Sequence, residues 1–159
     1  MFSEYDNSPI VEEYVDGYGV GVSLIIGNDG KERSAFCHKR ISEYPASGGP
    51  SCSLETFYDA DIIAKTICLL KQAGFVGIAM VEYKVRDGDY YFLEVNPRIW
   101  GSFGATYKTK SDFIKGYISA AKGTEYKFDP EYKIKRVKFL PIFSHLFCLI
   151  SKRRNTKKL

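Results

Sequence analysis

The chain has 159 residues, of which 45% are hydrophobic and 15% aromatic, a composition that suits one folded domain and excludes a disordered or fibrous chain. The net charge is +4, but five positive charges and no acids lie in the tail 151–159, so the remainder is close to neutral. This distribution argues against a nucleic-acid-binding protein that works through a basic face. We expect the tail to be a solvated terminus.

No zinc site, secretion signal or membrane span is predicted. The four cysteines form no C-x-x-C pair, and the two histidines lie too far apart for a zinc spacing. The first ten residues lack the basic and apolar regions of a signal peptide, which predicts a cytoplasmic protein. The longest apolar run, 139–150, is interrupted by Pro141 and too short to cross a bilayer.

The first third of the chain favours strands. Ile10 to Tyr14 and Val20 to Ile26 are rich in β-branched residues and flank turn residues, so they predict a hairpin. Lys31 to Arg40 follows another turn and predicts a third antiparallel strand. Residues 42–53 hold two prolines, two adjacent glycines and four serines, which predicts an irregular loop.

The rest of the chain alternates helical and strand patterns. Apolar positions between Ser53 and Gly74 follow helical spacing, with Ser53 as the expected N-cap and Gly74 just after the helix. Strands are predicted over 77–85 and 90–95, and a helix over 111–121 that is capped by Ser111 and ended by Gly123. A last strand and helix are expected within 133–150. The predicted class is α+β, an antiparallel sheet with covering helices.

Glu82, Glu94 and Asn96 form a candidate metal site. Glu94 and Asn96 project to the same side of their strand because side chains alternate between its faces. A three-residue turn at 87–89 would pair Arg86 with Tyr90 and place Glu82 opposite Glu94, whereas a two-residue turn would put them on opposite faces. The alternative is that both glutamates face solvent, paired with Lys84 or Arg86.

The chemistry of this set favours magnesium. Two like charges facing each other across a hairpin are destabilising and call for a compensating cation. Mg²⁺ prefers carboxylate and other oxygen ligands, with phosphates and water completing its shell. Mn²⁺ is the alternative cation.

The motifs VEY at 81–83 and FLEVNPR at 92–98 resemble the signature of the ATP-grasp superfamily, whose members include biotin carboxylase, carbamoyl-phosphate synthase and D-alanine ligase. The resemblance implies that Glu82, Glu94 and Asn96 bind the magnesium ions that bridge the ATP phosphates. It also implies that Arg98 contacts a transferred phosphate or an acyl-phosphate, an anion that suits a planar guanidinium.

The segment Glu12-Glu13-Tyr14-Val15 is similar to the family's hinge. The resemblance implies that backbone groups of Glu13 and Val15 bind adenine while the Glu12 carboxylate supports the site. The acidic residue that binds ribose in many relatives is missing from Gly17-Tyr18-Gly19, and Asp16 is its candidate substitute. An ordinary edge strand with outward glutamates is the alternative.

The segment from His38 to Ser51 is similar to carboxylate-amine-ligase-like members of the family. The resemblance makes Lys39 and Arg40 candidates for binding phosphate or a substrate carboxylate. Gly48 and Gly49 would let the backbone approach a ligand and form an anion nest. A solvent-exposed loop with a basic edge is the alternative.

The predicted organisation is an ATP-grasp C-terminal subdomain at 1–123, an extension at 124–150 and the basic tail at 151–159. The resemblance implies an ATP-dependent ligase that acts on small-molecule carboxylate and amine substrates through an acyl-phosphate. The family's N-terminal half is absent, so we expect a truncated chain, a split enzyme with that half as a separate chain, or a fragment. The alternatives are a non-catalytic nucleotide-binding or partner-docking module, or a peripheral membrane protein that uses 139–150 and the tail.

Overall fold

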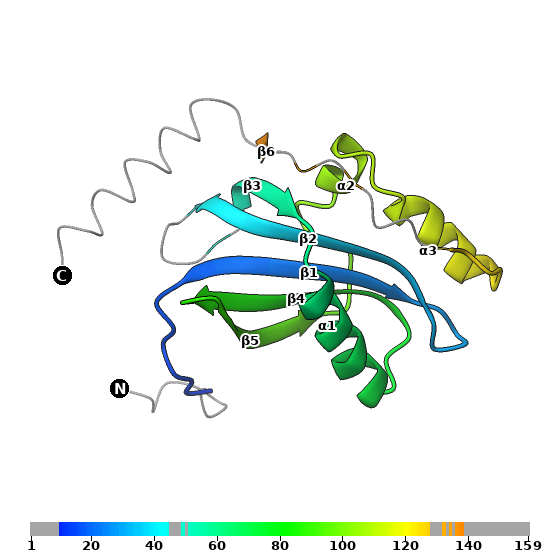
Figure 1. Ribbon diagram of the computed structural model, residues 1–159, viewed down its shortest axis with the longest axis horizontal. Helices are drawn as coiled ribbons and strands as arrows, with labels where there is room; N and C mark the ends of the chain where they lie inside the picture. The colour runs from blue at the N-terminus through cyan, green and yellow to red at the C-terminus, as the bar shows by residue number, and fades with distance from the viewer. Residues whose placement is uncertain are drawn as a thin grey trace, which may run out of the picture.

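The computed structural model describes residues 10–44, 49, 51–127, 132, 134 and 136–138. Within them, six antiparallel strands form one sheet of order β5-β4-β1-β2-β3-β6 (Figure 1). The strands are β1 Tyr18–Ile26, β2 Glu32–Glu43, β3 Ser51–Phe57, β4 Gly77–Arg86, β5 Asp89–Asn96 and β6 Arg136–Lys138. The helices are α1 Ala60–Gln72, α2 Gly104–Lys108 and α3 Phe113–Lys122. The predicted α+β class is confirmed.

Each face of the sheet carries its own apolar cluster. In Figure 1 α1 crosses in front of β1, β4 and β5, and its Ile62 and Leu70 pack with Val22 of β1 and other alternate residues of the sheet. The opposite face holds Phe36 and Phe113, in a cluster that includes residues of α2 and α3. Side chains alternate along a strand, so the sheet residues that do not face α1 lie on the face that carries α2 and α3.

The predicted N-terminal hairpin is wrong. Residues 10–16 form no regular element, and Ile10, Val11 and Tyr14 are 87%, 84% and 82% exposed. The reason lies in the topology: β1 already has β2 on one side and β4 on the other, so it has no free edge for another strand. The predicted strand at 31–40 is confirmed and extends to Glu43.

The boundary between the predicted loop and the predicted helix is also wrong. Residues from Ser51 pair with β2 as strand β3, and α1 begins only at Ala60. Asp59 is the actual N-cap, since its Oδ1 accepts from the N–H groups of Asp61 at 3.0 Å and Ile62 at 3.2 Å. The helix end is confirmed, with Gly74 at φ +66° just beyond it.

The later elements agree with the sequence patterns. Strands β4 and β5 and helix α3 occupy the predicted positions, and Gly123 ends α3 in the left-handed conformation. The N-cap of α3 is Asp112 rather than the predicted Ser111, which lies one residue earlier and whose Oγ accepts from the Phe113 N–H at 3.2 Å. The short helix α2 was not predicted. Of the strand and helix expected within 133–150, the strand is β6, and 139–150 lie outside the described residues. No described helix is long and apolar enough to cross a membrane.

Candidate functional site

Polar side chains of β2, β4 and β5 meet on the sheet face that α1 does not cover. Asn96 Nδ2 donates hydrogen bonds to Glu94 Oε1 at 2.8 Å and to Glu82 Oε1 at 3.3 Å. Arg98 Nη2 donates to Asn96 Oδ1 at 3.1 Å, and Arg40 Nη2 lies 2.5 Å from Glu82 Oε2. We call these five residues the carboxylate cluster.

Glu82 pairs with Glu94, but this pairing does not come from the three-residue turn that the sequence pattern would require for it. Arg86 pairs with Asp89, so the turn has two residues, Asp87 at φ 55° and Gly88 at φ 91°. Both positions have the positive φ that a two-residue hairpin turn demands. A register shift between Glu82 and Tyr83 adds one residue to β5 and brings Glu94 back to the face of Glu82. A turn and a bulge together therefore give the register that one longer turn would have given.

Two glycines of β1 let side chains of β2 cross the central strand. Gly19 pairs with Lys84, and Gly21 pairs with Glu82 on one side and His38 on the other. A Cβ at Gly19 would lie 2.9 Å from Arg40 Cδ, and one at Gly21 would lie 2.9 Å from His38 Nε2. Arg40 can therefore reach over β1 to Glu82. Gly17 to Gly19 were interpreted as a turn and as the stretch that lacks a ribose-binding acid, so this role of Gly19 and Gly21 was not predicted, although alternate glycines in a strand signal close approach.

Glu82 is held in a partly desolvated position. Its side chain is only 13% exposed. Burial raises the pKa of its carboxyl group, the Arg40 guanidinium opposes that rise, and the Glu94 charge adds to it. Because Glu82 is partly desolvated and the exposed Glu94 carboxylate repels it from the neighbouring strand, the cluster is a place where added positive charge is stabilising. The alternative pairing of Glu82 with Lys84 or Arg86 is not what the structure has, since its partner is Arg40.

A groove of ≈ 230 Å³ adjoins the cluster at Arg40. It is lined by Gly17, Tyr18, Gly19, Arg40, Ile41, Ser42, Glu43 and Lys84. Lys84 Nζ donates to the Gly17 carbonyl oxygen at 3.3 Å, and Arg40 Nη1 lies 3.7 Å from Glu43 Oε1. The groove thus joins the start of β1 to the carboxylate cluster. The sequence reasoning did not assign Glu43, and it considered Lys84 only as an ion-pair partner.

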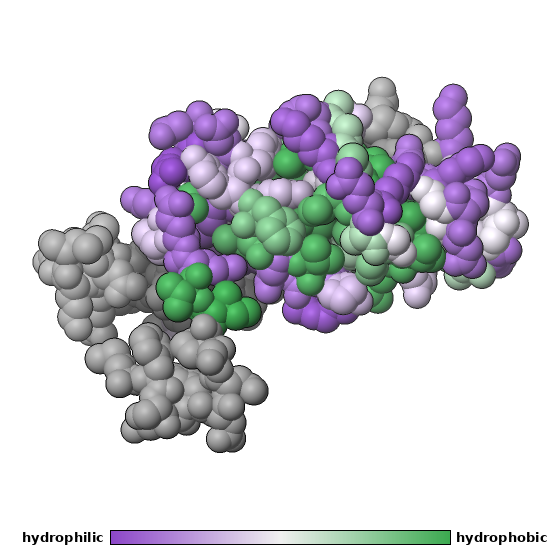
Figure 2. All heavy atoms as spheres, turned by 90° about the horizontal axis from the view of Figure 1, so that it is seen from below, coloured by the Kyte–Doolittle hydropathy of each residue, from purple (hydrophilic) through white to green (hydrophobic). Residues whose placement is uncertain are grey.

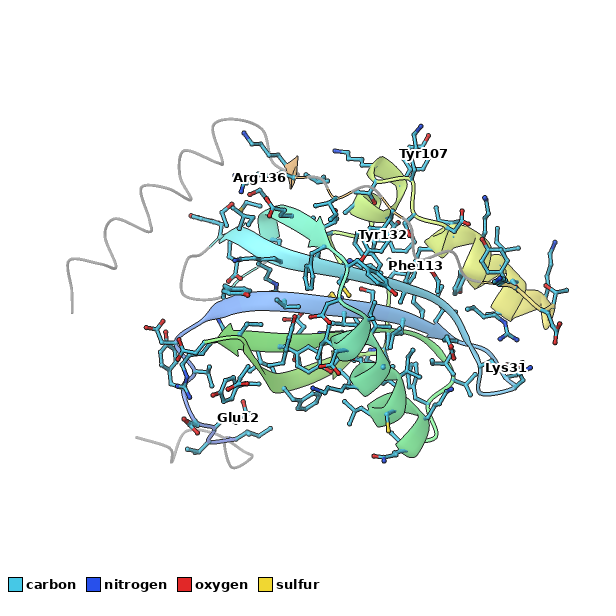
Figure 3. The ribbon with its side chains drawn as sticks, in the orientation of Figure 1. Glu12, Lys31, Tyr107, Phe113, Tyr132 and Arg136 are labelled. Carbon is cyan, nitrogen blue, oxygen red and sulfur yellow. The ribbon has the colours of Figure 1, made fainter. Side chains whose placement is uncertain are left out.

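The other predicted site residues are distributed around this region. Glu12, Glu13 and Asp16 are exposed and Val15 is buried, on the segment that leads into β1; Figure 3 labels Glu12 on this segment, outside the sheet. Lys39 lies away from Arg40, because neighbours on a strand face opposite ways, and its Nζ is 3.5 Å from the centre of the Tyr18 ring.

The predicted glycine loop is only partly described. Gly48 lies outside the described residues, and Gly49 has no regular structure. Residues 101–103 form a turn that leads directly into α2, whose first residue is Gly104. The buried Trp100 precedes this turn and packs edge-on against the rings of Phe103 and Phe113. It therefore fixes the chain just after Arg98.

The donor chemistry of the cluster fits a hard divalent cation. The described residues contain no group of three or more His, Cys, Asp and Glu side chains that could hold a metal, so the candidate set is two carboxylates and one amide. Asn96 offers its NH₂ to the carboxylates and its oxygen to Arg98. Ligation by Asn96 requires its amide to turn so that Oδ1 faces the carboxylate oxygens, as Mg²⁺ prefers oxygen ligands.

Comparison with known proteins gives consistent results at the levels of sequence and fold. A family model described as ATP-grasp domain matches residues 1–102. The tyramine–L-glutamate ligase of Methanocaldococcus jannaschii is 25% identical over 142 residues, which cover 87% of this chain and 43% of that protein.

Two solved structures share the fold. A phosphoribosylaminoimidazole carboxylase ATPase subunit from Aquifex aeolicus matches 77% of this chain and 40% of its own, with a TM-score of 0.62 and 18% identity. A biotin carboxylase–beta-gamma-ATP complex from Campylobacter jejuni matches 79% and 30%, with a TM-score of 0.60 and 18% identity. The chain therefore spans less than half the length of each of these three proteins.

Proposed function

Because the chain belongs to the ATP-grasp domain family, we propose that it forms the nucleotide- and metal-binding part of an ATP-dependent carboxylate–amine ligase. The observation that carries this proposal is the meeting of Glu82, Glu94 and Asn96 on one open sheet face, flanked by two arginines. The name of one relative, tyramine–L-glutamate ligase, describes the joining of an amine to an amino acid. This supports the substrate classes.

Each residue of the cluster has a proposed role. Glu82, Glu94 and the Asn96 oxygen hold Mg²⁺, with Mn²⁺ as an alternative, and the bound cation neutralises phosphate charge. Arg98, exposed at the end of β5, binds the transferred phosphate. Arg40 binds a phosphate or the substrate carboxylate.

The segment before β1 is the proposed adenosine-binding edge. Its position at the mouth of the groove supports this assignment, because Gly17 and Gly19 line the groove directly after it. Backbone groups of Glu13 and Val15 bind adenine. The carboxylates of Glu12 and Asp16 support the base and the ribose.

The proposed reaction has two steps. A substrate carboxylate oxygen attacks the γ-phosphorus of ATP, the bond to the β–γ bridging oxygen breaks, and ADP leaves. The amine nitrogen then attacks the acyl carbon, the bond to the phosphate oxygen breaks, and the amine gives up a proton as the amide forms. The arginines stabilise the charge that passes through the phosphate in both steps.

We propose that catalysis requires further charged groups that do not belong to this sheet face. Phosphate transfer needs charge neutralisation and alignment from several directions, whereas the cluster approaches a ligand from one side. Exposed apolar residues support a protein partner: Ile10, Val11 and Tyr14 on the segment that leads into β1. Figure 2 views the molecule from below, the side on which β5 and the end of α1 lie in Figure 1, and shows apolar side chains gathered on this surface. We propose that residues 1–123 form the subdomain and that a further half covers the site.

Calorimetry with Mg-ATP tests the cation assignment. Glu94→Gln removes a charged ligand but keeps the shape, so we expect it to weaken the magnesium-dependent affinity about tenfold or more. Glu55→Gln is the matched control. Glu55 lies on β3, three strands away from β4, and its Oε2 is 3.0 Å from Arg136 Nη2. Equal affinity of Glu94→Gln and the parent for Mg-ATP would refute the assignment.

Addition of a separately expressed N-terminal half of an ATP-grasp domain tests the need for a further half. We expect the 159 residues alone to bind Mg-ATP weakly without turnover, and the mixture to release phosphate with a suitable carboxylate. Ligation by the 159 residues alone would contradict this. Binding of Mg-ATP without turnover in the mixture would favour the non-catalytic nucleotide-binding module.

A further inference from the structure

Lys84 is a half-buried ammonium group with no carboxylate partner within the part of the chain that the structure describes. Its Nζ donates to one neutral acceptor, the Gly17 carbonyl oxygen, at 3.3 Å. An ammonium has three donors, and a partly desolvated charge with unused donors favours an anion beside it. Lys84 also lies on the same sheet face as Glu82, two residues and about 7 Å farther along β4.

The charges of the carboxylate cluster and the groove balance only while no cation is bound. Their carboxylates are Glu43, Glu82 and Glu94, and their cationic side chains are Arg40, Lys84 and Arg98. Three negative charges thus meet three positive ones, with Arg40 shared between Glu82 at 2.5 Å and Glu43 at 3.7 Å. A divalent cation at Glu82 and Glu94 would leave two positive charges uncompensated, and the groove with Lys84 is the adjoining open space.

We propose that the groove is an oxyanion subsite, in which Lys84 and Arg40 hold one phosphate or carboxylate group of a ligand whose other anionic group lies on the cation. The inference rests on the proposed cation site and adds Lys84 and the groove to it. Gly19 keeps the floor of the groove open, since a Cβ there would lie 2.9 Å from Arg40 Cδ and 3.3 Å from Glu43 Oε1. A phosphate chain that runs from the cation along β4 reaches Lys84 after about 7 Å, the distance between alternate residues of a strand.

Calorimetry with inorganic tripolyphosphate at saturating Mn²⁺ tests the subsite. We expect Lys84→Met to weaken tripolyphosphate binding about tenfold or more, because it removes a hydrogen bond between charged groups. Lys84→Arg should retain most of the affinity. Orthophosphate is too short to span from the cation to Lys84, so its affinity should change less than about twofold. Lys65→Met is the control, because Lys65 is 68% exposed on α1, which covers the other face.

A second ligand, L-glutamate, separates the two sources of the oxyanion. If Lys84→Met lowers the affinity for tripolyphosphate, the subsite binds a phosphate group. If it lowers only the affinity for L-glutamate, the subsite binds the substrate carboxylate. Unchanged affinity for both ligands overturns the inference.

The cation site is measured separately, by the paramagnetic resonance of Mn²⁺ without any oxyanion. Lys84→Met should not weaken Mn²⁺ binding, because it removes a positive charge near the cation, and Glu94→Gln should weaken it. Failure of the parent to bind Mn²⁺ refutes the proposed function, whereas normal Mn²⁺ binding with no effect of Lys84→Met on either oxyanion refutes only the subsite.

Discussion

Gly21→Ala should destabilise the protein through a single contact with His38. The new Cβ would lie 2.9 Å from His38 Nε2 and 3.1 Å from Nδ1, well inside van der Waals contact. The His38 ring is 1% exposed, so it has no free space to move into. Overpacking of this kind costs about 1–3 kcal/mol, while alanine gains about 0.5–1 kcal/mol over glycine in a strand. We expect a net loss of about 1 kcal/mol in the free energy of unfolding.

A double-mutant cycle with urea unfolding isolates that contact. In the His38→Ala background the ring is gone, so Gly21→Ala should stabilise the protein by about 0.5–1 kcal/mol, and a coupling energy of about 1–3 kcal/mol is expected. Gly101→Ala is the control, because a Cβ there meets no atom within 4 Å. The reasoning fails if Gly21→Ala costs the same in both backgrounds, or no more than Gly101→Ala.

The composition of the metal site could be predicted from the sequence, but its register could not. Glu94 and Asn96 share a face by strand alternation alone, and Asp87-Gly88 marks the hairpin. A bulge next to Glu82 has no signal in the residues Phe92 and Leu93, so the register was predicted by the wrong route. The pairing agrees because a two-residue turn plus one bulged residue is equivalent to a three-residue turn.

The role of Arg40 needed the sheet order as well as the residue pattern. Strand alternation separates Arg40 from Lys39, and once β2 lies beside β1 only one of the two can face Glu82. The reach of Arg40 over β1 depends on Gly19, which lies far away in sequence. Long-range pairing of this kind is not encoded in any local window, so the two basic residues looked equivalent.

The misplaced start of α1 has a local cause. Ser53 is a good N-cap by residue type, but the helical spacing of apolar residues begins only at Ala60, directly after Asp59. In the stretch before it, Cys52, Leu54 and Thr56 are buried at every second position, and Ser53 is buried as well. The alternate buried positions and the cap at Asp59 together would have indicated strand β3. The prediction instead followed the turn residues of the preceding loop and began the helix at Ser53.

Two further perturbations test the packing behind the site. The Tyr132 hydroxyl, placed behind β2 and β3 (Figure 3), accepts from the Cys37 N–H at 3.0 Å and donates to the Phe57 carbonyl oxygen; Tyr132→Phe leaves both groups unpaired, so urea unfolding should show a loss of about 1–3 kcal/mol, and an unchanged midpoint would contradict it. Burial, with a smaller contribution from the Arg40 charge, lowers the pKa of His38 to about 3 from its ordinary 6.5. The unfolded chain therefore binds a proton at His38 below pH 6.5 that the folded protein does not, and stability falls as the pH decreases through the window between 6.5 and 3. Linkage gives this one group a loss of about 2 kcal/mol between pH 7.5 and pH 5. Because other groups also titrate in acid, the quantity to measure is the difference in pH dependence between the parent and His38→Asn, which has no proton to bind. Parallel stability curves for the two proteins over that range would show that His38 is not held neutral by its burial.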